Sequence, residues 1–248
     1  MHSFLGAVQF LTRVPVRLRT APDLARSAAW FPMVGALIGA SIGLVAAGLS
    51  ELVPANVAAA VAVLVGVALT GAFHEDGLAD TADAMGGWTP ERRREILKDS
   101  RHGSYGVAAM CGSILLRVVC VAALAPAAAF AGLVVAHTLG RAAAVGVMAG
   151  ARPTGAPGLG ADYARSLRPA RAAGSIAAAV GVAALAGGWW AVPTAAAVAV
   201  AGALLAGVLV RAFDGISGDH LGAVEQIGEC VALVMVSGLA ASHALWWS

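Results

Sequence analysis

The chain has 248 residues, of which 59% are hydrophobic and only 12% are charged, and its formal net charge is +2. Soluble domains average about 25% charged residues, so this composition excludes an ordinary soluble globular protein, and we expect no nucleic-acid partner. Several apolar runs of about 18 residues or more are long enough to cross a bilayer as helices. We therefore predict an all-α, polytopic membrane helix bundle that forms a single domain over residues 1–248, with the lipid bilayer as its surroundings.

Seven apolar segments are candidates for membrane-spanning helices, and a short amphipathic helix precedes them. The first residues, "MHSFLGAVQFLTRVPVRLRT", have a short apolar part followed by positive charges, which is typical of a helix lying at the membrane surface rather than of a signal peptide. The predicted spans are 30–50, 55–73, 105–125, 128–149, 174–191, 193–212 and 228–247.

Charged residues gather in every second connection between these segments. Besides the N-terminal segment, the loops 74–104, 150–173 and 211–227 hold most of them, whereas the other connections and the C-terminal end hold only Glu51. The positive-inside rule therefore predicts a cytoplasmic N-terminus and an external C-terminus. We expect the polar loops, and with them the active site, to lie on the cytoplasmic side of a bacterial inner membrane.

The stretch "GAFHEDGLADTADAMGG" places acidic side chains directly after the second apolar segment. Asp76, Asp80 and Asp83 are spaced by four and three residues, which puts them on one helix face. Three converging carboxylates repel one another unless a cation lies among them, and oxygen ligands favour Mg²⁺, Mn²⁺ or Ca²⁺ over zinc. The pattern predicts a metal site, with Glu75 as a weaker candidate ligand and His74 as a candidate ligand or proton donor.

Two alternatives without a metal or catalytic role apply to these residues. The acidic face could be a solvated surface, although residues 71–87 contain no Lys or Arg, which solvated helices usually mix with their acids. His74 could be a hydrogen-bonded histidine at the membrane interface.

The stretch "KDSRHGSYG" has the chemistry of a phosphate site. Lys98 and Arg101 are cations, and Ser104 offers a hydroxyl near the start of a predicted helix. Positive charge in a cytoplasmic loop is also expected from topology alone. The preceding "ERRREILK" is typical of a solvated surface helix.

A third polar stretch, "RAFDGISGDHLGAVEQIGE", contains Asp219, and Glu225 and Glu229 follow at the entrance to an apolar run. A carboxylate from here could complete a metal site, and a plain polar turn is the alternative. Arg117 and Arg141 lie inside predicted spans, where an arginine usually faces the bundle interior. We expect Arg141 to reach a substrate or an acidic partner.

Five stretches in this order resemble the cobalamin synthase family: "FLTRVPV", "WFPMVGALIGA", "FHEDGLADTADAMGG", "DSRHGSYG" and "GDHLGAVEQIGE". The resemblance implies a magnesium-dependent adenosylcobinamide-GDP ribazoletransferase of the bacterial cytoplasmic membrane. Such an enzyme transfers the adenosylcobinamide-phosphate moiety of adenosylcobinamide-GDP to α-ribazole or α-ribazole 5′-phosphate. GMP leaves, and adenosylcobalamin or its 5′-phosphate forms in the last assembly step of cobalamin biosynthesis.

The resemblance also implies roles for the candidate residues. The three aspartates of the acidic stretch would hold Mg²⁺ against the diphosphate, and Asp83 or His74 would take the proton of the attacking hydroxyl. Lys98 and Arg101 would hold a phosphate. Asp219 would bind a second metal or orient a ribose.

Two other functions are open alternatives. A CDP-alcohol phosphotransferase would share the chemistry, but the signature arginine of that class is missing from this stretch. A divalent-cation transporter would use the aspartates as an entry site, although acids deep in the membrane are not evident. A homodimer is possible.

Overall fold

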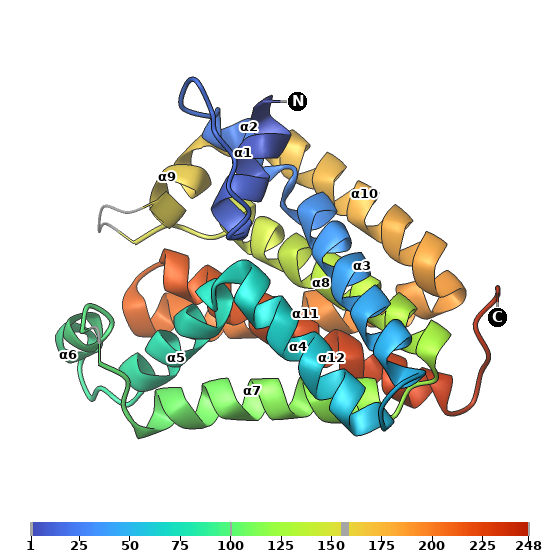
Figure 1. The fold of residues 1–248 in the computed structure, drawn as a ribbon. Helices are drawn as coiled ribbons and strands as arrows, with labels where there is room; N and C mark the ends of the chain where they lie inside the picture. Colours follow the sequence, from blue (N-terminus) through green and yellow to red (C-terminus); the bar gives the residue numbers. More distant parts are fainter. Residues whose placement is uncertain (1, 100, 155–158, 248) are drawn as a thin grey trace.

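The computed structural model describes residues 2–99, 101–154 and 159–247. Apart from one isolated bridge between Pro153 and Ile216, these residues form helices and turns, which confirms the all-α prediction (Figure 1). The helices are α1 (His2–Leu11), α2 (Leu24–Ala28), α3 (Phe31–Ser50), α4 (Ala55–Thr70), α5 (Phe73–Met85), α6 (Pro90–Ile96), α7 (Ser104–Ala122), α8 (Pro126–Gly150), α9 (Leu159–Ser166), α10 (Pro169–Gly187), the 3₁₀ turn η1 (Gly188–Trp190), α11 (Ala191–Phe213) and α12 (Gly218–Ala240).

The described part of the chain contains five helical stretches that are long and apolar enough to cross a membrane, or six if α4 and α5 are counted together as one bent span. One of the five, Pro169–Phe213, has 45 residues and contains both α10 and α11. A straight helix of that length would measure about 68 Å, more than twice the hydrocarbon core. The polytopic helical bundle is confirmed, and the count of seven spans stays a prediction.

The position predicted for the last span, 228–247, is wrong, because α12 begins ten residues earlier, at Gly218, and ends at Ala240. Ser217 caps its first turn: the side-chain oxygen accepts from the backbone N–H of His220, and the His220 ring accepts from the N–H of Ser217. Glu225, placed in a polar loop by the sequence, is therefore a helical residue. The charges do not break the helix because they have partners inside the bundle, as described below.

The second span also ends earlier than predicted, at Thr70. Gly71 and Ala72 both adopt left-handed backbone angles (φ 67° and 57°), and α5 leaves α4 at 88°. Left-handed angles stop helix propagation and are easiest for glycine. The acidic helix is consequently turned away from α4 and packs against α7 and α12.

The crossing of α5 and α12 is close because glycines face each other there. A Cβ atom on Gly77 would lie 2.8 Å from the carbonyl oxygen of Asp219, and one on Gly222 would lie 3.4 Å from the Cα of Gly77. Small residues allow this approach of two backbones. It brings the acidic face of α5 to the start of α12.

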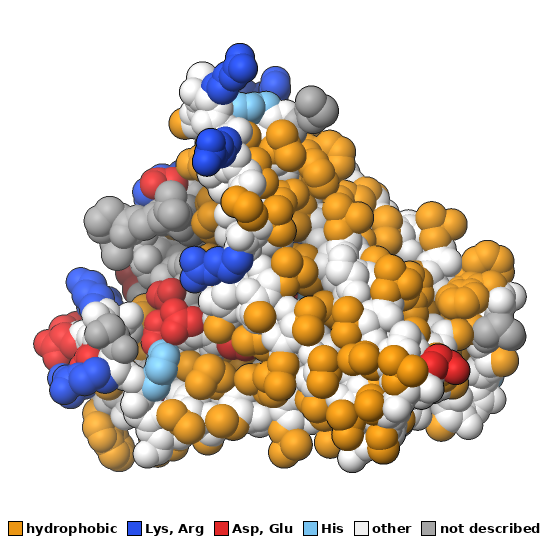
Figure 2. Space-filling model, in the orientation of Figure 1, with side chains coloured by type: hydrophobic (Ala, Val, Ile, Leu, Met, Phe, Trp, Pro, Cys, Tyr) orange, Lys and Arg blue, Asp and Glu red, His pale blue; other side chains and the backbone are white. Residues whose placement is uncertain are grey.

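The charged side chains are unevenly distributed over the surface. Figure 2 shows Lys, Arg, Asp and Glu gathered over the N-terminal segment and near α5 and α6, while hydrophobic side chains cover most of the remaining face. Large apolar residues such as Leu44, Leu115 and Leu204 are more than 60% exposed. This distribution suits a bundle whose sides contact lipid and whose polar end contacts water.

Candidate active site at the crossing of α5 and α12

The polar end of the bundle contains a cluster of two carboxylates and an imidazole. Asp76 and Asp80 come from α5, and His102 comes from the loop before α7. His102 Nε2 lies 3.4 Å from an Asp76 oxygen, and its Nδ1 lies 3.5 Å from an Asp80 oxygen. The three groups offer possible ligand atoms within 4.8 Å of one another. We call these residues the Asp76–Asp80–His102 cluster.

Asp219 adds a third carboxylate beside this cluster. It lies in the first turn of α12, where the contact with Gly77 holds its backbone against α5. Its negative charge is close enough to repel those of Asp76 and Asp80. Three carboxylates gathered in this way favour a bound cation. The structure thus brings together Asp76, Asp80 and Asp219, three of the residues selected from the sequence.

Asp83 binds backbone N–H groups rather than the groups of the cluster. Its two carboxylate oxygens accept hydrogen bonds from the backbone N–H groups of Gly103 (2.6 Å) and Gly106 (2.8 Å). A carboxylate at this position satisfies N–H groups at the start of α7. Asp83 therefore fastens the loop that carries His102 to α5, and it lies outside the Asp76–Asp80–His102 cluster.

Glu75 points into the bundle interior instead of toward the cluster. Its side chain is 2% exposed and accepts a hydrogen bond of 2.8 Å from Arg117 of α7. His74 is also buried, and its Nδ1 lies 3.6 Å from an oxygen of Glu225. Both residues were candidate metal ligands, and the structure places them on the side of α5 that faces α7 and α12.

Glu75 belongs to an extended set of buried charges. Arg117 also donates to Glu229 (3.0 Å), and Arg141 pairs with Glu229 (2.9 Å) and Glu225 (2.6 Å). His137 contacts Glu229 as well. We call this set the buried charge network; all six of its members are at most 4% exposed, and they are Glu75, Arg117, His137, Arg141, Glu225 and Glu229.

The buried charge network agrees with one of the two roles expected for Arg141 and corrects one other expectation. Arg141, a candidate substrate ligand, is paired with acidic residues, which was the other role considered for it. Acids do occur inside an apolar helix, because Glu225 and Glu229 lie within the candidate span α12. Two arginines occupy these carboxylates, so they are a poor site for a metal cation although His137, Glu225 and Glu229 lie close enough to form one.

The candidate phosphate ligands are exposed on the loop between α6 and α7. Arg101 donates two side-chain hydrogen bonds to Asp99 (2.9 and 2.7 Å), and these bonds lower the pKa of Asp99 to about 2. Lys98 is exposed, and Ser104 is the exposed first residue of α7. All three are close to His102 in sequence, and the guanidinium of Arg101 is directed to Asp99.

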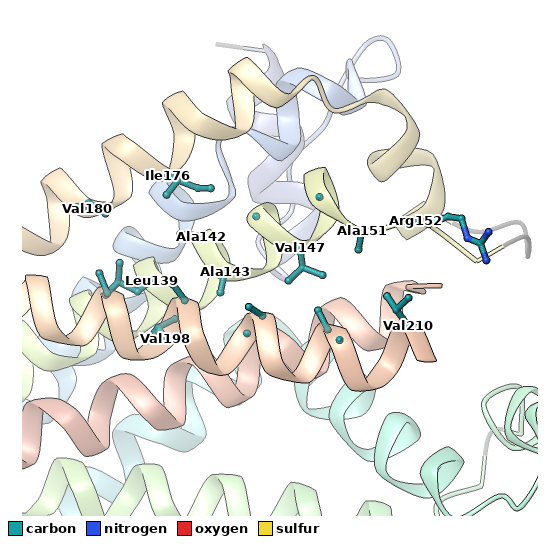
Figure 3. Close-up of a pocket in the computed structure, with 18 of the residues that line it drawn as sticks. Leu139, Ala142, Ala143, Val147, Ala151, Arg152, Ile176, Val180, Val198 and Val210 are labelled. Carbon is teal, nitrogen blue, oxygen red and sulfur yellow. The ribbon is translucent and has the colours of Figure 1, made fainter. Parts of the chain in front are cut away.

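Two cavities differ in whether a residue of the cluster lines them. The larger, about 820 Å³, is apolar and runs between α8, α10 and α11, with Arg152 at one end (Figure 3). It contains no residue of the Asp76–Asp80–His102 cluster. The smaller, about 340 Å³, lies between the end of α1 and the bend from α4 to α5, and Asp76 forms part of its lining.

His102 was not selected from the sequence, although it stands in the quoted stretch "DSRHGSYG". The only feature of the sequence that could have indicated His102 was its place in a polar loop after an acidic helix. The spacing of 22 residues from Asp80 gives no periodicity that would connect them, because the contact depends on how Asp83 holds the loop.

A helical membrane bundle with carboxylates and an imidazole converging at its polar end defines a class: polytopic membrane proteins with a cluster of possible metal ligands at one end. Comparison with known families makes this more specific. Residues 3–237 match the family model described as cobalamin-5-phosphate synthase, and the chain belongs to this family.

Related proteins carry a consistent name. A Ralstonia pickettii protein named adenosylcobinamide-GDP ribazoletransferase is 39% identical over 92% of this chain and 91% of its own length. A protein of the same name from Ralstonia nicotianae is 36% identical with the same coverage, and one from Shewanella amazonensis is 42% identical over 60% of each chain. No solved structure gave a significant match.

Proposed function

We propose that this protein is an adenosylcobinamide-GDP ribazoletransferase. The family membership and the names of the relatives support this activity. The structural observation that carries it is the convergence of Asp76, Asp80, His102 and Asp219 from three separate segments at the polar end of the bundle.

The reaction is a phosphoryl transfer with a diphosphate substrate. A ribose hydroxyl of α-ribazole or α-ribazole 5′-phosphate forms a bond to the cobinamide-linked phosphorus of adenosylcobinamide-GDP. The bond from that phosphorus to the bridging oxygen breaks, GMP leaves with this oxygen, and the hydroxyl proton passes to a base. Such transfers depend mainly on positioning and on stabilisation of negative charge.

The residues present suit Mg²⁺. Carboxylate oxygens are its preferred protein ligands, and Asp76 and Asp80, with Asp219 beside them, supply them in one place. When bound, Mg²⁺ supplies charge neutralisation for the diphosphate. The imidazole nitrogen of His102 suits Mg²⁺ less well than an oxygen does.

His102 is instead suited to accept the proton of the attacking hydroxyl. Its ring is 31% exposed and lies between Asp76 and Asp80, whose negative charges would stabilise the imidazolium formed when the ring takes up a proton. Of the two residues expected from the sequence to accept this proton, Asp83 has both oxygens occupied by N–H groups, and His74 is buried beside Glu225.

The enzyme would work at the cytoplasmic face of a bacterial inner membrane. The basic N-terminal segment and the polar loops gather at the end of the bundle that carries the cluster (Figure 2). The positive-inside rule places such an end in the cytoplasm, where water-soluble nucleotide substrates are available.

A transfer assay in liposomes tests the proposal. We expect GMP release and a new cobamide from adenosylcobinamide-GDP with α-ribazole or its 5′-phosphate, only when Mg²⁺ is added. Folded protein without this turnover would contradict the proposal. Parallel arms with CDP-alcohol substrates and with cation flux into proteoliposomes test the two alternative functions.

A further inference from the structure

The stretch "FLTRVPV" has no role in the site described so far, but its arginine is held in a defined place. Thr12, directly after α1, donates from its N–H and its hydroxyl to the carbonyl of Val8. The next residue, Arg13, donates its backbone N–H to the carbonyl of Leu69 at 2.7 Å. The segment after α1 is therefore attached to the last turn of α4, directly before the bend into α5.

The Arg13 side chain lies over this bend. A Cβ atom on Gly71 would overlap the Arg13 guanidinium. Gly71 is thus required twice, for its left-handed backbone (φ 67°) and for the space that Arg13 occupies. The guanidinium is positioned at the start of the acidic helix.

The 340 Å³ cavity connects this arginine to the carboxylate cluster. Its lining includes Gln9, Thr12 and Arg13 from the end of α1 and the segment after it. Residues 70–73 at the bend and Asp76 of α5 complete the lining. The volume is that of a small-ligand pocket. Within the described residues, Arg13 makes no ion pair of 4.0 Å or less with a carboxylate, so its positive charge is available to a ligand.

We infer that Arg13 binds a phosphate of the diphosphate in the nucleotide-linked substrate, in the cavity that it lines together with Asp76. The inference rests on the proposed function and assigns a binding residue for that same site. A guanidinium offers paired donors that match phosphate oxygens, and an anion held between Arg13 and a cation at Asp76 would be neutralised from two sides.

A substitution series with separate kinetic constants tests this role. In Arg13→Ala, we expect the KM for adenosylcobinamide-GDP to rise about 10- to 100-fold, as for loss of a charged hydrogen bond, with a smaller rise in Arg13→Lys. The KM for α-ribazole should stay unchanged. Arg17→Ala is the matched control: it removes an exposed arginine of the same segment and should behave as wild type.

Binding without turnover gives a second readout. GDP with Mg²⁺ should raise the thermal midpoint of the wild type and of Arg17→Ala, and should raise that of Arg13→Ala much less at the same concentration. The midpoints without ligand show whether each variant is folded, and Arg13→Lys provides the comparison if the alanine variant is not.

The outcomes separate this inference from the proposed function. No GMP release by folded wild type contradicts the function. Wild-type turnover with an unchanged KM for adenosylcobinamide-GDP in Arg13→Ala contradicts only the role of Arg13. A change in KM confined to α-ribazole 5′-phosphate would assign the cavity to the riboside phosphate. A change in KM seen in phosphatidylglycerol vesicles but absent in phosphatidylcholine vesicles would assign Arg13 to a lipid headgroup. Either result overturns the inference.

Discussion

Asp76 and Asp80 differ from the other acids of α5 in what they contact. Glu75 pairs with Arg117 and Asp83 accepts backbone N–H groups, whereas Asp76 and Asp80 face His102 and Asp219. This separates, within one short helix, the carboxylates available to a ligand from those that hold the fold.

Asp80→Asn tests this separation. The substitution keeps the shape and removes a charge that we propose binds Mg²⁺, so we expect transfer activity to fall at least about 100-fold and the Mg²⁺ concentration for half-maximal activity to rise. Glu91→Gln, on exposed α6, is the control and should leave both quantities unchanged. Equal activity of Asp80→Asn and wild type over a Mg²⁺ titration would refute the metal assignment.

The buried charge network gives a stability prediction. Glu229 pairs with both Arg117 and Arg141, so Glu229→Gln leaves buried cations without their shared carboxylate. Removing one partner of a buried pair typically costs about 3 kcal/mol or more. We expect a markedly lower thermal midpoint in detergent, whereas Glu95→Gln, which breaks an exposed pair with Arg92, should change the midpoint little. Similar midpoints for the two variants would show that the network does not stabilise the bundle.

Residue spacing predicted part of the site. The four-residue step from Asp76 to Asp80 placed both on one face, and the structure agrees. Asp83 lies on the same helix, but its partners come from 20 and 23 residues later, and no local pattern shows such contacts. His102 was missed for the same reason, because its position depends on the loop that Asp83 holds.

At the scale of elements, the crossing of α5 and α12 determines whether Asp219 meets the cluster. Gly77→Ala would place a methyl group 2.8 Å from the Asp219 carbonyl, and backbone cannot easily move away. We expect lower thermal stability and reduced transfer activity. Gly112→Ala in α7 is the matched control, since a Cβ there meets nothing within 4 Å and alanine favours helix. A Gly77→Ala variant as active and stable as Gly112→Ala would mean that the close crossing is not needed.

Apolar length predicted most of the helices well, including α3, α7 and α8, because a run of apolar residues is a local property. It failed for the start of α12, where Glu225 and the residues before it were assigned to a polar loop. The partners of Glu225 and Glu229 lie on α5, α7 and α8, so the sequence around them does not show that their charges are compensated. The bend after Thr70 was missed because it depends on backbone angles at Gly71 and Ala72.

At the scale of the whole molecule, seven crossings would put the two termini on opposite sides of the membrane. Small epitope tags at each end test this in intact cells and in inverted vesicles. We expect the N-terminal tag to be accessible only in inverted vesicles and the C-terminal tag only from outside. Both tags on one side would require an even number of crossings and would contradict the predicted topology.

The buried charge network has a consequence for the order in which a ribosome makes the chain. Arg117 can meet Glu75 soon after synthesis, but Arg141 and His137 find their carboxylates only on α12, which is made much later. Until then an arginine in a nascent membrane helix lacks its counter-charge. Completion of the network is thus delayed until α12 has been made, and chains that stop before Gly218 should be recognised as unfinished and degraded by membrane proteases.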